Sequence, residues 1–191
     1  VKGENGDSST LFTYKGYKII DGKAVIEGLP NARPDSDTKT LIISLVDEVT
    51  DCELNLYYTV YPKYDIISRY FSLTNKGNKD IKIEKAMSIC LDLPGHNYDA
   101  LTLHGCQTME MNVQRSSLTY GNFSVTSRRG ASSHDFNPFI ALVSKNADEE
   151  TGEVYAFNFV YSGSFLNEVE VNAHGNTRVS VGLGTETFGY T

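Results

Sequence analysis

The segment richest in reactive side chains is residues 127–139, which read Ser-Arg-Arg-Gly-Ala-Ser-Ser-His-Asp-Phe-Asn-Pro-Phe. A serine hydrolase needs a serine nucleophile, a histidine that accepts its proton and a carboxylate that orients the histidine. Ser132 or Ser133 together with His134 supplies the first two of these residue types. Neighbours along a chain rarely meet in that geometry, and the sequence has no Gly-x-Ser-x-Gly turn to expose the nucleophile. We therefore assign no catalytic residue in this segment.

Two other interpretations of the segment stay open. In the first, an arginine pairs with a carboxylate of the same fold while serine and asparagine side chains bind the loop backbone. In the second, the loop faces a sugar or another protein surface, because the planar donor group of arginine suits carboxylates on a facing surface. We predict an ordered interdomain or inter-subunit contact surface with the two arginines as its charged anchors. Its candidate residues are Arg128, Arg129, Ser132, Ser133, His134 and Asn137.

The residue types that bind metals or phosphates are scattered along the chain. The four histidines and three cysteines form no pair with the spacing of a zinc or redox site, and no glycine-rich phosphate-binding motif occurs. The 24 acidic residues offer many carboxylate pairs for glycosidase chemistry, so their number selects none. The sequence therefore predicts no metal and no cofactor. These histidines and cysteines are His96, His104, His134, His174, Cys52, Cys90 and Cys106.

Tyrosine is the most abundant aromatic residue, with twelve copies against nine phenylalanines and no tryptophan. Sugar-binding modules expose aromatic rings that stack on pyranose faces, often those of tryptophan. The lack of tryptophan disfavours an independent galactose- or carbohydrate-binding module, but this class stays the alternative to a structural domain. Tyr57 and Tyr61 are the first candidates for such stacking.

The composition excludes several classes of partner. A net charge of −7 works against binding to nucleic acid, which draws its affinity from clustered lysine and arginine. No apolar run approaches the length of a membrane-spanning helix, so no membrane partner is expected. An odd number of cysteines without paired spacing is typical of free thiols, which indicates a reducing, cytoplasmic location.

Alternation of apolar and polar residues predicts strands along almost the whole chain, with little or no helix. In residues 52–61 one face carries apolar residues and the other mostly polar ones, which predicts one core face. This strand is expected to pair with residues 40–46, and residues 66–74 with 81–91. Residues 121–138 lose the alternation and predict a long ordered loop with at most one strand. The apolar side of residues 52–61 consists of Leu54, Leu56, Tyr58 and Val60, and the other side of Glu53, Asn55, Tyr57 and Thr59.

About a dozen strands are enough for two stacked sheets, so we predict an all-β, antiparallel β-sandwich. Residues 1–10 combine glycine, serine and charge without an apolar anchor, which predicts a flexible linker or loop. Residues 11–191 are expected to form a single β-sandwich domain. The remaining expected strands are residues 98–104, 109–115, 139–144, 153–161, 165–172 and 177–183.

Several stretches taken together, in order along the chain, resemble a known family. They are residues 16–23 (Gly-Tyr-Lys-Ile-Ile-Asp-Gly-Lys), 27–30 (Glu-Gly-Leu-Pro), 127–134, 137–139 (Asn-Pro-Phe) and 153–165, which end in Val-Tyr-Ser-Gly-Ser-Phe. Each piece is short, but their succession is specific. The sequence resembles the N-terminal β-supersandwich domain of family 36 α-galactosidases.

This resemblance implies a parent enzyme that removes terminal α-galactose from sugars such as melibiose and raffinose with retention of configuration. It places the two catalytic aspartates on a (β/α)8 barrel, and no alternating βα pattern occurs here, so no catalytic residue can be carried over. The implied partners are that barrel, further copies in a homo-oligomer and an α-galactoside at the active site of the parent. It further implies that the chain is truncated relative to the full N-terminal domain of the family.

Overall fold

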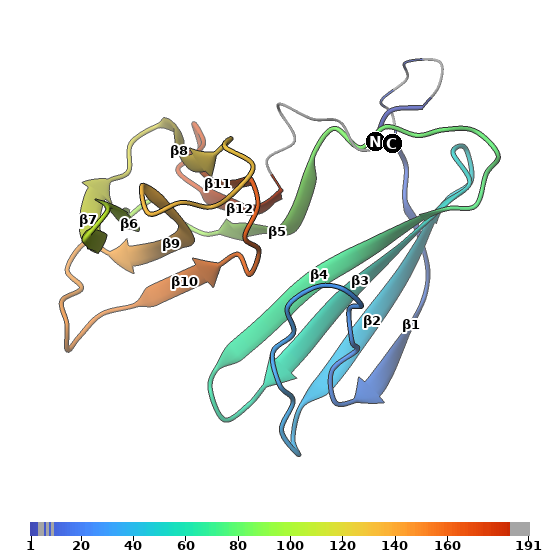
Figure 1. Cartoon of the computed structure of the whole chain (residues 1–191), viewed down its shortest axis with the longest axis horizontal. Helices are drawn as coiled ribbons and strands as arrows, with labels where there is room; N and C mark the ends of the chain where they lie inside the picture. The colour runs from blue at the N-terminus through green and yellow to red at the C-terminus, as the bar shows by residue number, and fades with distance from the viewer. Residues whose placement is uncertain (4–5, 7, 9, 184–191) are drawn as a thin grey trace. The chain divides into compact units, whose positions relative to one another are not determined.

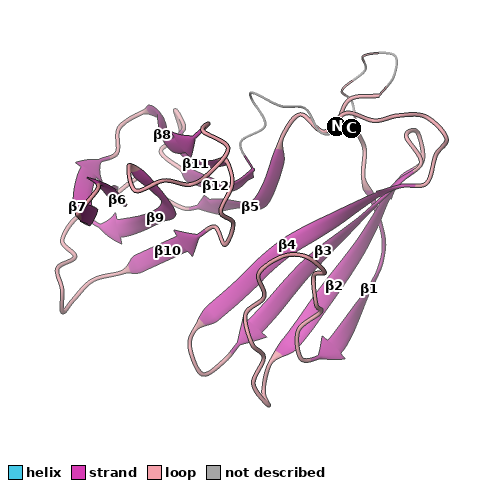
Figure 2. Cartoon of the chain, in the orientation of Figure 1, coloured by secondary structure: helices cyan, strands magenta, loops and turns pink. Residues whose placement is uncertain are grey.

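The computed structural model describes residues 1–3, 6, 8 and 10–183, which contain twelve strands and no helix (Figures 1 and 2). All strand pairs are antiparallel, which confirms the prediction of an all-β antiparallel fold. The strands are β1 (Thr13–Asp21), β2 (Lys39–Asp47), β3 (Cys52–Tyr61), β4 (Ile66–Asn75), β5 (Ala86–Leu93), β6 (Tyr98–Cys106), β7 (Met109–Ser117), β8 (Gly121–Ser127), β9 (Phe136–Ser144), β10 (Val154–Asn158), β11 (Phe165–Val171) and β12 (Thr177–Leu183).

The described residues form two compact units, the first ending at Lys85 and the second beginning at Ala86. The single β-sandwich domain expected over residues 11–191 stays a prediction. The linker expected at residues 1–10 lies partly outside the described residues. Within the described part, Lys2 forms an antiparallel bridge with Lys82, with N–O distances of 2.7 and 2.8 Å.

The first unit is one four-stranded sheet with the order β1-β2-β3-β4. Leu41 of β2 pairs with Ile19 of β1 and with Tyr58 of β3. Directly paired residues of antiparallel strands lie on the same face of a sheet, so these three side chains share one face. The regular alternation of apolar residues along β2 and β3 therefore builds a continuous apolar face.

The opposite face of this sheet is covered by the segment between β1 and β2. In that segment Ala24 accepts a hydrogen bond at 3.2 Å from the hydroxyl of Tyr70, and Gly22 accepts one at 2.7 Å from Thr40 Oγ1. Tyr70 also stacks on Tyr57, with 4.2 Å between ring centroids and 7° between planes. Burial under this cover raises the pKa of Tyr70 to about 12.

The segment between β1 and β2 reverses the burial expected along β3. The sequence predicts that the apolar side of this strand is its core face. Instead, Thr59 on the polar side is fully buried and bonds Thr40 through hydroxyl groups 2.8 Å apart, whereas Val60 is 43% exposed. That prediction is wrong for this end of β3, because local alternation shows that two faces differ but not which one a distant segment covers.

The second unit is a two-layer sandwich of the sheets β10-β9-β6-β7 and β5-β12-β11-β8. Inward-pointing residues of both sheets meet in one core, as expected for stacked sheets with a side-chain period of two. Ile140 and Leu142 of β9 and Val169 of β11 are fully buried in it. The buried core residues are Ala100, Leu118, Ile140, Leu142, Val169, Val171, Val179 and Val181.

Arg115 of β7 holds the turn between β9 and β10 in the second unit. Its Nε donates to Asp99 Oδ2 at 2.8 Å. Its two terminal nitrogens donate to the carbonyl oxygens of Ala147 at 2.7 Å, Ser144 at 3.0 Å and Lys145 at 2.9 Å. One guanidinium group therefore binds one oxygen of a buried carboxylate and three carbonyl groups of a turn.

No helix of a length and hydropathy able to cross a membrane occurs in the part of the chain that the structure describes. Among the cysteines, Cys52 is buried, and Cys90 and Cys106 are exposed.

Candidate interface loop

The candidate loop, residues 128–135, connects β8 to β9. The segment predicted as one long loop, residues 121–138, thus contains the single strand β8, and its irregular part is shorter because β9 already begins at Phe136. The start of the loop is anchored by Ser127, which pairs with Phe165 of β11. Phe165 is fully buried, so the entrance to the loop is fixed to the core of the second unit.

A second segment, residues 162–164, lies against the candidate loop. The backbone N–H of Ser132 donates to the carbonyl oxygen of Ser162 at 2.8 Å, and the Ser132 hydroxyl contacts the same oxygen at 3.4 Å. The N–H of Gly130 donates to Ser164 Oγ at 3.1 Å. Gly130 has a φ of +79°, a left-handed conformation that L side chains rarely adopt, so glycine is required there.

Several other side chains make contacts within the loop or with Ser127 at its start. Arg129 forms an ion pair with Asp135, and His134 Nε2 lies 3.6 Å from the same carboxylate. Ser127 Oγ donates to the Ala131 carbonyl oxygen at 2.6 Å, and Ser133 Oγ accepts the N–H of Asp135 at 3.2 Å. These bonds keep the loop ordered.

The arrangement follows the first of the two interpretations for Arg129, whose carboxylate partner lies in the same loop. Arg128, Arg129 and His134 are nevertheless exposed, while Ser132 and Asn137 are half-buried. The loop therefore presents two cations and an imidazole on a backbone that is held by its neighbours. The proposed contact role for these residues stays a prediction.

Sequence reasoning missed the contact between the loop and residues 162–164. Both segments belong to the stretches that carry the family resemblance, so a signal existed. It did not reveal the contact, because the pairing of Ser132 with Ser162 depends on the neighbouring positions of β8 and β11 across the sheet.

A second polar site lies at the ends of β5 and β12. Arg178 binds both oxygens of Asp92, with distances of 2.7 Å from Nε and 2.9 Å from Nη2. The guanidinium group lowers the pKa of Asp92. A cavity of about 290 Å³ adjoins this pair and is lined also by Glu170 and two asparagines. Because Arg178 holds both of its carboxylate oxygens, Asp92 is fixed in an ion pair and is not a free acid or base.

The tyrosines considered for sugar stacking do not offer open ring faces. Tyr57 is half-buried and stacks on Tyr70. Tyr61 is buried, and burial raises its pKa. These positions therefore do not favour an independent carbohydrate-binding module. In the described ranges, no group of three or more histidine, cysteine, aspartate or glutamate side chains is arranged to hold a metal ion.

Comparison with known proteins identifies relatives over the full length of the chain. The model of the glycosyl hydrolase family 36 N-terminal domain matches residues 1–191. The α-galactosidase AgaA of Geobacillus stearothermophilus is 43% identical over 190 residues, which cover 98% of this chain and 26% of AgaA. The bifunctional α-galactosidase/sucrose kinase AgaSK of Mediterraneibacter gnavus is 39% identical over 191 residues, covering 100% of this chain and 20% of that protein. The chain thus spans about a quarter or less of these relatives.

Solved structures agree with the sequence relatives. The crystal structure of AgaA superposes with a TM-score of 0.96 at 42% identity, covering 99% of this chain and 27% of AgaA. The structure of an α-galactosidase from Lactobacillus brevis gives a TM-score of 0.95 at 35% identity, covering 99% of this chain and 26% of that one. These matches confirm the resemblance seen in the sequence motifs. The chain belongs to the N-terminal domains of glycosyl hydrolase family 36.

Proposed function

We propose that the chain is the non-catalytic N-terminal β-sandwich part of an α-galactosidase that hydrolyses terminal α-D-galactosyl residues of oligosaccharides such as melibiose and raffinose. The observation that carries this proposal is the match of the whole chain to about a quarter of AgaA, an α-galactosidase. A variant of AgaA has been solved in complex with raffinose, which supports the substrate class. A cytoplasmic location belongs to the same proposal and rests on three cysteines without paired spacing.

The proposed role of the chain is structural and not catalytic. Retaining glycosidases need two carboxylates about 5–5.5 Å apart on either side of the scissile bond. The family resemblance assigns these to a (β/α)8 barrel elsewhere in the parent enzyme. In our proposal the chain supports that barrel and helps to assemble a homo-oligomer, while the barrel binds the α-galactoside.

The proposal predicts that the isolated 191-residue chain does not hydrolyse a chromogenic α-galactoside, whereas the full-length parent does. The physical reason is that double displacement needs the carboxylate pair of the barrel. Release of nitrophenol by both proteins is compared with a mock purification. Turnover by the isolated chain that survives repurification, or a full-length parent without α-galactosidase activity, contradicts the proposal.

The candidate loop is the surface that we propose for contact with the barrel or with a neighbouring subunit. Its backbone is held by residues 162–164, so presenting the loop to a partner costs little ordering entropy. Arg128 and Arg129 are exposed at its start, directly after β8. A guanidinium group can bind a facing carboxylate through two parallel hydrogen bonds, which gives the contact a defined direction.

Charge reversal of both arginines tests this role. In the full-length parent, Arg128→Glu combined with Arg129→Glu is expected to weaken the oligomer or lower the activity. In the 191-residue chain the same change is expected to cost about 1 kcal/mol or less, as exposed charge changes usually do. Sedimentation and activity assays measure the first effect, and urea denaturation the second.

The matched control reverses two exposed lysines that are not part of the loop, Lys18→Glu with Lys145→Glu. This variant changes the net charge by the same amount, so it separates a general charge effect from a local contact. If the arginine variant leaves the parent assembled and active but unfolds the isolated chain, the arginines are internal structural residues and the proposed contact role is wrong.

A further inference from the structure

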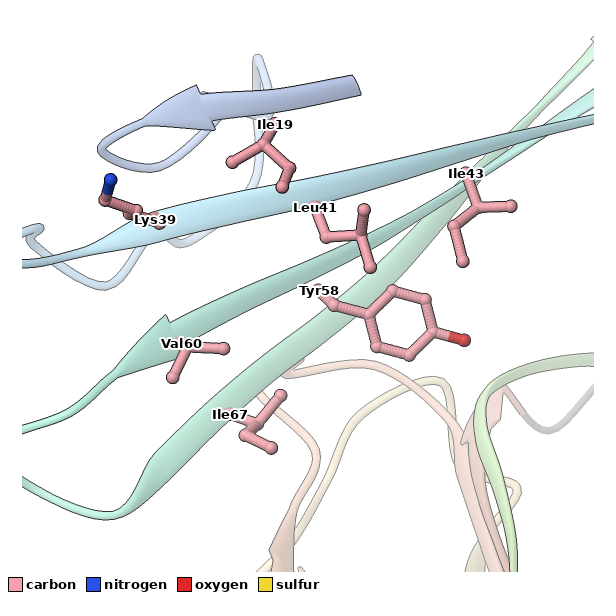
Figure 3. A pocket seen from close by; sticks show the side chains of 7 residues that line it. All are labelled: Ile19, Lys39, Leu41, Ile43, Tyr58, Val60 and Ile67. Carbon is pink, nitrogen blue, oxygen red and sulfur yellow. The ribbon is translucent and has the colours of Figure 1, made fainter. Parts of the chain in front are cut away.

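The sheet of the first unit carries an apolar face that consists of Ile19, Leu41, Ile43, Tyr58, Val60 and Ile67 (Figure 3). These side chains line a shallow hollow of about 470 Å³. Ile19 is 61% exposed and Ile67 is 62% exposed. The residues come from all four strands of the sheet, so the face is continuous across it.

Such a face is unlike the usual solvent-facing side of a sheet. When an antiparallel sheet has one solvated side, that side normally carries the polar residues of the alternation. Here the polar side is the covered one, where Thr40 and Thr59 are fully buried under the segment between β1 and β2. Burying Ile19 and Ile67 would contribute a favourable free energy of about 25 cal/mol for each Å² of apolar area removed from water. The face is therefore suited to a packing partner.

The chemistry of the face indicates an apolar protein surface and not a small polar ligand. The two cations beside it already have partners. Lys39 Nζ lies 3.6 Å from Asp21 Oδ1. Arg69 lies over the ring of Tyr58 at 4.4 Å and donates to its hydroxyl at 2.9 Å. What remains for a partner is mainly aliphatic and aromatic surface, which makes non-directional contacts.

We propose that this apolar face is buried in the full-length enzyme by a part of the same polypeptide outside these 191 residues. The inference rests on the proposed function, in which the chain is one part of a longer α-galactosidase. AgaA keeps this fold at a TM-score of 0.96 while the matched region makes up only 27% of its chain. A segment tethered to the face is present at a high effective concentration, so it occupies the face ahead of a second molecule.

The test measures how fast a thiol placed on the face reacts with a maleimide. In the full-length parent, the Ile67→Cys variant is expected to react at least about tenfold more slowly than the same variant of the 191-residue chain, because a buried thiol reacts only after local opening. Val49→Cys is the matched control, since Val49 is 84% exposed in the turn between β2 and β3. Peptide mass spectrometry separates these sites from the native cysteines, and Ile19→Cys repeats the test if Ile67→Cys does not fold.

Three results would overturn the inference. Fast reaction of the Ile67→Cys variant in the full-length parent means that the face is open to solvent. Slow reaction in the 191-residue chain as well means that no outside segment is needed. Protection that disappears on dilution to the dissociated protein means that a second copy covers the face. Failure of the proposed function gives a different result. In that case the full-length parent does not cleave α-galactosides, but the thiol on the face is still protected.

Discussion

Replacing Phe165 with alanine is expected to lower the free energy of unfolding of the second unit by about 3–5 kcal/mol, the range typical of a fully buried phenylalanine. Phe165 begins β11 and pairs with Ser127 of β8 and Leu183 of β12. Its side chain has no solvent exposure. The strands on both sides restrict the collapse of the cavity, so most of the lost packing energy is not recovered. Urea denaturation of the 191-residue chain measures the change.

The matched control is Phe136→Ala, because Phe136 has the same side chain at the start of β9 but is half-exposed. We expect a loss of about 1 kcal/mol there, since less apolar area leaves the core. Equal losses for the two variants would show that the position of Phe165 in the core does not determine its contribution. A large loss for Phe165→Ala also predicts that the candidate loop, which starts beside it, becomes susceptible to proteolysis.

The second large effect is expected for Arg115→Leu, which should cost about 3 kcal/mol, the low end of the loss on removing one partner of a buried ion pair, because the Arg115 side chain is itself 37% exposed. The variant leaves the carboxylate of Asp99 without its guanidinium partner, and Asp99 is buried. It also removes the donors that bind the carbonyl groups of Ser144, Lys145 and Ala147. Unsatisfied polar groups that stay out of water cost more than the bond itself contributes. Thermal and urea unfolding measure the loss.

Two comparisons isolate the cause. Arg178→Leu removes an arginine that binds both oxygens of Asp92 in an exposed pair, and we expect about 0–1 kcal/mol there. Combining Arg115→Leu with Asp99→Asn should recover part of the loss, because the uncompensated charge is then gone. If Arg115→Leu costs no more than Arg178→Leu, the four bonds of Arg115 contribute little and the prediction is wrong.

The sequence by itself determined most of the strands and the family. The hairpin expected between residues 66–74 and 81–91 is wrong, because β5 begins at Ala86 and pairs with β12, whereas β4 pairs with β3. The strand expected at residues 52–61 is β3 (Cys52–Tyr61), because alternation and the flanking turn residues are local properties. The family resemblance rested on short stretches in a fixed order, which a single sequence displays. The expected loop after Gly121 was only partly correct, since pairing of Phe136 with His104 extends β9 into it.

Only the tertiary structure decided which surfaces are covered and which distant groups meet. Thr59 and Val60 are neighbours in β3, yet Thr59 is buried and Val60 is exposed, because the segment that covers the polar face comes from the chain before β2. Similarly, Arg115 binds a turn about 30 residues further along the chain. Alternation reports the polarity of each face, whereas burial depends on non-local contacts that the pattern of one strand does not contain.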